Sequence, residues 1–67
     1  MKIVVIENYS DLEKVSDNLI VDISKLSPKL SLRAIDFLLG LTYKFGSLKR
    51  IERCKYLVRI GDNNGKN

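Results

Sequence analysis

Few residues in this chain are of the types that carry out catalytic chemistry. The 67 residues include no histidine, so the side chain that most often acts as a general base is missing. Cys54 is the one cysteine, and it stands between Arg53 and Lys55. A single thiol with neither a histidine nor a second cysteine completes no disulfide and no Cys/His zinc site within one chain. We therefore interpret Cys54 as incidental to function.

Asp22, in the apolar segment VDIS, is the second candidate for chemistry. A carboxyl group partly buried there could have the raised pKa of a functional acid. The structural alternative, which is the more frequent one, is a strand-end carboxylate bonded to a neighbouring backbone amide. The sequence has no P-loop, dinucleotide fingerprint, G-x-S-x-G or H-E-x-x-H motif. We therefore predict a protein that is not an enzyme and that needs no cofactor and no metal.

Positive charge is the more informative feature, and it gathers near the C-terminal end. The net charge is +4, and between positions 44 and 60 a single acid, Glu52, opposes six cations. These cations are Lys44, Lys49, Arg50, Arg53, Lys55 and Arg59. Beside the aromatic ring of Tyr56, they could bind an acidic peptide, a phosphate backbone or an anionic membrane surface. They could also be a solvated set of charges that protects a sheet edge.

The elements that must position these residues follow from the apolar pattern. It predicts strands over 3–6, 19–24, 48–53 and 55–60, a short amphipathic helix over 11–17 and a long helix over 28–44. Ser10 and Glu13 have the spacing of a capping box for the short helix. Ser27 is a good N-cap for the long helix, and Gly46 is its stop. The continuous β-branched run from Ile3 to Ile6 is typical of a central strand covered on both faces.

The order β-α-β-α-β-β predicts an α+β fold, a compact two-layer domain whose mixed sheet has two helices packed against it. The chain is long enough for one domain only, which we place at residues 1–61. Residues 62–67 contain no apolar side chain and are predicted to be a disordered tail.

The long helix is apolar on two sides when its residues are placed at about 100° intervals. One side holds Leu30, Ala34, Phe37, Leu38, Leu41 and Phe45. The other side holds Leu32, Ile35, Leu39 and Tyr43. One sheet covers one side of a helix, so the second side is either further core or a contact with another chain. Gly40, on the polar wedge beside Asp36, favours the second option because a missing side chain allows another backbone to approach closely. A chain this short is marginally stable alone, and we expect at least a dimer.

The segment AIDFLLGLTYKFG-SLKRIERCKYLVRI resembles the helix-and-hairpin signature of the SepF family of cell-division proteins. That signature is a hydrophobic helix with V/I-D-F-x-x-G-x-x-Y, a short glycine turn, a basic hairpin strand that contains isoleucine, and a final strand of aromatic and aliphatic residues. The strand KIVVIE and the segment LIVDISKLSPKL fit the first half of the family pattern. The resemblance extends from Met1 to about Ile60.

The resemblance implies a dimeric, cytoplasmic adaptor at the division site. Its core would bind the C-terminal peptide of the tubulin-like protein FtsZ and would help organise or tether the division ring. By position, Arg50 and Tyr56 match residues at the peptide groove of the family, and we add Lys49 from the same basic strand. Gly40 matches a helix glycine at the contact between dimers, and the helix could also support higher assembly. The helix residues that we add to this self-association site are Asp36, Leu39 and Tyr43.

The chain also departs from the family pattern. It starts at the first strand, so we expect membrane attachment only through a segment absent from this chain. The chain itself would then be either a trimmed core domain or a minimal member of the family. Glu52 stands where the family often has glycine, and Arg59-Ile60 replaces the usual Thr-Pro. The alternative is an Alba-like dimeric nucleic-acid-binding protein, which has the same element order and a basic hairpin. Nucleic acid is the less favoured partner because the hairpin is short and the positive excess is modest.

Overall fold

Six elements follow one another in the computed structural model, which describes residues 2–16, 18–44 and 46–60. They are β1 (Lys2–Val5), the 3-10 helix η1 (Tyr9–Lys14), β2 (Leu19–Asp22), α1 (Pro28–Thr42), β3 (Ser47–Glu52) and β4 (Lys55–Arg59). The predicted α+β fold, with a four-stranded mixed sheet and two helices, is confirmed. The tail predicted for residues 62–67 lies outside the described residues.

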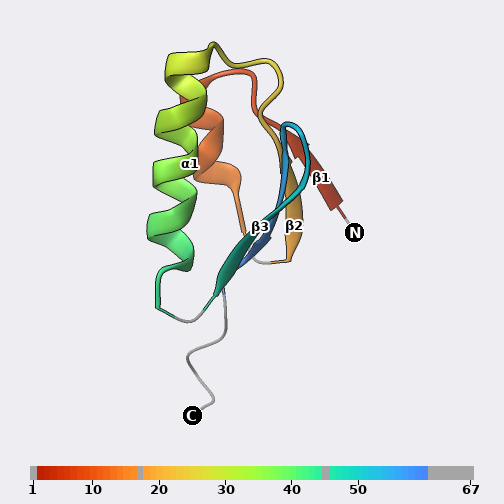
Figure 1. Cartoon of the computed structure of the whole chain (residues 1–67), viewed down its shortest axis with the longest axis vertical. Helices are drawn as coiled ribbons and strands as arrows, with labels where there is room; N and C mark the ends of the chain where they lie inside the picture. The colour runs from red at the N-terminus through yellow and green to blue at the C-terminus, as the bar shows by residue number, and fades with distance from the viewer. Residues whose placement is uncertain (1, 17, 45, 61–67) are drawn as a thin grey trace.

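The strand order in the sheet is β1-β2-β4-β3. The strands β1 and β2 are parallel, whereas β4 is antiparallel to both β2 and β3. Both helices lie on one face of the sheet, with α1 contacting η1, β3 and β4 (Figure 1). No described helix covers the opposite face, which we call the outer sheet face (Figure 1).

The core fills the space between the helices and the inner face of the sheet. Alternate residues of a strand point to opposite faces, and the inward set of the central strands is apolar. Thus Leu19 and Val21 of β2 meet Val58 of β4 and Leu38 of α1 in one buried cluster. Among the described residues, the buried apolar ones are Ile6, Leu12, Leu19, Val21, Ile23, Leu26, Ala34, Leu38 and Val58. The helix that carries Leu38 is thereby fixed over the β3–β4 hairpin.

The prediction that Ile3–Ile6 form a central strand covered on both faces is wrong. The strand β1 lies at an edge of the sheet, and the outward side chains of Ile3 and Val5 are 52% and 41% exposed. Val4 and Ile6 point inward, and Ile6 is fully buried. A β-branched run satisfies a strand with one buried face as well as a strand with two, because β-branched side chains fit any pleated surface.

The first helix differs from the prediction in type, position and cap. It is a 3-10 helix over Tyr9–Lys14, and its N-cap is Asn8 rather than Ser10. The carboxylate of Asp11 accepts backbone N–H bonds from Glu7 and Asn8, each at 3.1 Å. These bonds to the charged form lower the pKa of Asp11. The cap therefore uses Asp11 and not Glu13.

The connections around the long helix are close to the prediction. The hydroxyl of Ser27 accepts the N–H of Leu30 at 3.3 Å, as expected of an N-cap. The helix α1 ends at Thr42, two residues before the predicted end, and the N–H of Gly46 donates to the Thr42 carbonyl at 3.2 Å. A Cβ on Gly46 would overlap the backbone of Arg59, so this position requires glycine. Phe45 lies outside the described residues.

Candidate functional site

The β3–β4 hairpin carries the residues predicted to bind a peptide, and its register decides which of them share a face. Arg50 is the cross-strand partner of Tyr56, and Lys49 is the partner of Leu57. Tyr56 also pairs with buried Val21 on the inner face, so Arg50 and Tyr56 are both on the helix side of the sheet. Lys49 is on the outer sheet face. The structure thus brings Arg50 and Tyr56 together and separates Lys49 from them.

The two paired side chains have different environments. Arg50 is exposed on β3, which is an edge strand. Tyr56 is half-buried and packs against the core cluster. Directly opposed residues of an antiparallel pair have Cβ atoms about 5 Å apart, close enough for one ligand to contact both. The arrangement places an exposed cation beside a half-buried aromatic ring at the β3 edge of the sheet.

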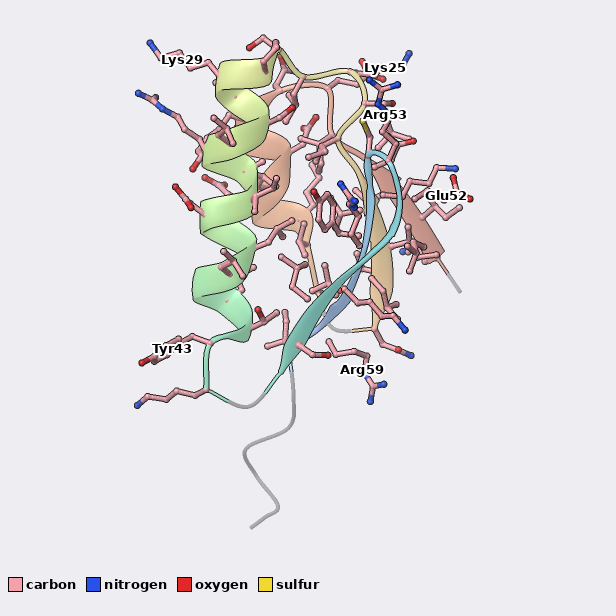
Figure 2. All side chains as sticks on the ribbon, viewed as in Figure 1. Lys25, Lys29, Tyr43, Glu52, Arg53 and Arg59 are labelled. Carbon is pink, nitrogen blue, oxygen red and sulfur yellow. The ribbon has the colours of Figure 1, made fainter. Side chains whose placement is uncertain are left out.

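The turn end of the hairpin is held to the rest of the sheet. The Cys54 carbonyl accepts the N–H of Ile23 at 2.9 Å, and the Cys54 side chain is half-buried. Glu52 and Lys55 face each other across the turn, with 3.5 Å between Glu52 Oε1 and Lys55 Nζ. Arg53 and Lys25 lie at this same end of the molecule (Figure 2). One of the predicted cations is therefore partly neutralised within the hairpin.

Asp22 does not have the raised pKa that would indicate a functional acid, so that hypothesis is wrong. Its Oδ1 accepts the N–H of Ser24 at 2.9 Å. This bond, and then the positive charges of Lys55 and Lys25, lower the pKa of Asp22. The structural alternative, a strand-end carboxylate bonded to a backbone amide, describes this residue.

On the second apolar side of α1, Ile35 packs against the core, whereas the other three residues are exposed. Leu32, Leu39 and Tyr43 are 68%, 51% and 81% exposed, and Ile35 is half-buried. We call these four residues the α1 stripe. Tyr43 points away from the body of the molecule at the C-terminal end of the helix (Figure 2).

Gly40 and Asp36 lie beside the α1 stripe. Both are exposed, and a Cβ added to Gly40 would meet no atom within 4 Å. Packing within the described part of the chain therefore does not require glycine at position 40. The space above it is open to a second backbone.

The outer sheet face carries an apolar row that sequence reasoning missed. Ile3, Ile20, Leu57 and Lys49 are in register across all four strands. The first three are apolar, and Val5 lies beside Ile3 on the same face. The signal is present in the sequence, since three of the four outward positions in the first two strands, Ile3, Val5 and Ile20, are apolar, and only Asp22 is polar. It was misread because β1 was expected to be covered on both faces.

The described residues contain no group of three or more histidine, cysteine, aspartate or glutamate side chains that could hold a metal ion. None of the described helices has the length and apolar character needed to cross a membrane. No family model, curated protein or solved structure matches the chain.

Proposed function

We propose that this chain is a non-enzymatic cell-division adaptor with a SepF-like core, which binds the C-terminal peptide of FtsZ at the division site. The proposal starts from the resemblance of the α1 and β3–β4 segments to that family. The observation that carries it is the register of the hairpin, in which Arg50 and Tyr56 are direct partners on the helix side. Two residues matched separately to one peptide groove thus lie side by side.

The chemistry of the pair suits a short peptide with apolar and acidic side chains. The Tyr56 ring offers a large, stiff apolar surface that loses little rotamer entropy on binding. The Arg50 guanidinium can hold a carboxylate through two parallel hydrogen bonds, which a lysine cannot imitate. Lys49 points to the opposite face, so its contribution is limited to long-range attraction of an acidic ligand.

The same proposal includes a homodimer, and the outer sheet face is the surface best suited to it. Sheets are stable when their apolar faces are covered by a second layer, and two sheets can stack about 10 Å apart. Here Ile3, Val5 and Ile20 of one copy would be covered by the sheet of the other. The self-association residues on the helix, which are Gly40, Asp36 and the stripe residues Leu39 and Tyr43, then remain available for contacts between dimers.

Calorimetric titration with an FtsZ C-terminal peptide tests the function. Arg50→Ala is expected to weaken binding by about 1 kcal/mol at low salt, and the loss should shrink as salt rises. Lys49→Ala is the matched control, since it removes one cation from the next position of the same strand on the other face. Equal losses for both variants would mean that only net charge matters.

Tyr56→Ala supplies the apolar half of the test. It is expected to cost about 2 kcal/mol or more in binding free energy for the peptide. Because the ring also packs on the core, a thermal melt of the variant must show that the domain is still folded. Titration with double-stranded DNA separates the Alba-like alternative. A nucleic-acid affinity that exceeds the peptide affinity and falls by orders of magnitude with salt would overturn the adaptor proposal.

A further inference from the structure

The two edges of the sheet are protected to different degrees. An edge strand exposes unpaired backbone groups, and proteins usually protect it with charges, proline or a β-bulge. The β3 edge has Lys49, Arg50 and a bulge at Ile51, where two residues of β3 oppose one residue of β4. The β1 edge, Lys2–Val5, has three consecutive β-branched residues and neither bulge, proline nor glycine.

The backbone direction of β1 shows which groups face the free edge. The N–H of Ile6 donates to the Asp22 carbonyl at 2.9 Å, toward β2. Because backbone groups alternate in direction along a strand, those of Val4 also face β2. The N–H and C=O groups of Ile3 and Val5 therefore point away from β2, to the edge where no described strand pairs with β1.

We propose that β1 pairs with β1 of a second copy of this chain in antiparallel orientation, centred on Val4. In this register Ile3 of one copy faces Val5 of the other, and the two residues exchange both backbone hydrogen bonds. The pairing occurs twice about the twofold axis and joins the two four-stranded sheets into one. The side chains of Ile3 and Val5 contact their counterparts on the outer sheet face, which lengthens the apolar row.

The charges that flank β1 select the antiparallel orientation. Lys2 stands at one end of the strand and Glu7 just beyond the other end, and both are exposed. In the antiparallel register centred on Val4, Lys2 of each copy lies opposite Ile6 of the other copy and one residue from its Glu7, so opposite charges meet at each end of the pair. Parallel pairing would place Lys2 beside Lys2 and Glu7 beside Glu7. The charges and bulge of β3 disfavour pairing of β1 with β3, which would generate an open fibre instead of a closed pair.

This contact joins two β1 edges side by side, so it is distinct from the stacking of outer sheet faces proposed above, from the peptide site and from the α1 stripe, and it depends on none of them. Its first test is charge reversal, with association measured by sedimentation at low salt. Lys2→Glu and Glu7→Lys are each expected to weaken association about tenfold, because two attractive pairs become repulsive. An equimolar mixture of the two variants restores both attractive pairs and should associate as the wild type does. A mixture no stronger than either single variant overturns the proposal.

The second test measures the register by disulfide trapping in a Cys54→Ser background. Ile3→Cys and Val5→Cys, each at an exposed position, are oxidised separately and as a mixture. Directly opposed residues have Cα atoms about 5.5 Å apart, within the range that a disulfide spans. Equivalent residues, Ile3 with Ile3 or Val5 with Val5, would be about 8 Å apart, which is too far.

The expected result is a cross-linked dimer from the mixture and none from either variant alone, with Gly40→Lys leaving the yield unchanged. Cross-linking of one variant alone would show a different register and overturn this one. Circular dichroism establishes that each variant folds. Folded variants that yield no cross-link under any condition would show that β1 does not pair with a second copy.

Discussion

Replacement of Gly40 separates the stability of one chain from assembly between chains. Gly40 lies inside α1, exposed, with nothing within 4 Å of an added Cβ. Glycine in an exposed helix interior costs about 0.8–1 kcal/mol relative to alanine, and lysine is nearly as good a helix former. Gly40→Ala and Gly40→Lys should therefore each raise the free energy of unfolding by about 0.8 kcal/mol. For a domain of this size that corresponds to roughly 3–6 °C in Tm.

The two variants differ in bulk, so they should differ in assembly. If another backbone approaches α1 at Gly40, a methyl group hinders it modestly and a lysine side chain blocks it. Urea denaturation of dilute protein measures stability, and light scattering against concentration measures assembly. Higher stability combined with weaker assembly, weakest for lysine, is the expected pair of results. Lower stability would mean that Gly40 is an internal packing site, and unchanged assembly would remove it from the contact.

Three further outcomes follow from the structure. Leu38→Ala should lower the free energy of unfolding by about 2–5 kcal/mol because Leu38 is fully buried, whereas Leu39→Ala, one position along and half exposed, should change it by under about 0.5 kcal/mol. Gly46→Ala should cost at least about 2 kcal/mol in urea denaturation, since its Cβ would overlap the backbone of Arg59. The pKa values of Asp11 and Asp22 are lowered from 3.8, so their stabilisation is present above that pH and is lost as pH falls through the folded values. Urea titrations between about pH 2 and 6 should show this loss, and Asp11→Asn should flatten the profile.

The parts of the fold that could be predicted are those with local signals. Ser27 caps the start of α1 with its hydroxyl, and Gly46 follows the end of α1 at a position with no room for a side chain. The alternation of apolar and polar residues in β4 identifies its inward side chains. The apolar second side of α1 also follows from helical spacing alone. The place of β1 could not be predicted, because its β-branched run is equally compatible with an edge and with the centre of the sheet. That choice depends on whether a second strand pairs with β1, and in this sheet β4 pairs with β2 and β3 instead.

The composition of the candidate site depends on a single inserted residue. Glu52 pairs with Lys55 at the turn, so an unbulged ladder would continue by pairing Ile51 with Tyr56. Arg50 would then oppose Leu57 on the outer sheet face. The bulge at Ile51 shifts the ladder by one residue, and a shift of one residue moves side chains to the opposite face.

Because of this shift, Arg50 rather than Ile51 stands opposite the Tyr56 ring, and Lys49 lies on the outer sheet face. No composition or periodicity in the basic strand distinguishes the two registers, so sequence reasoning grouped both cations into one site. The bulge also twists and interrupts the β3 edge, which protects it from pairing with another strand. One irregularity thus places the Arg50 guanidinium on the helix side and interrupts the edge strand β3, at the opposite edge of the sheet from β1.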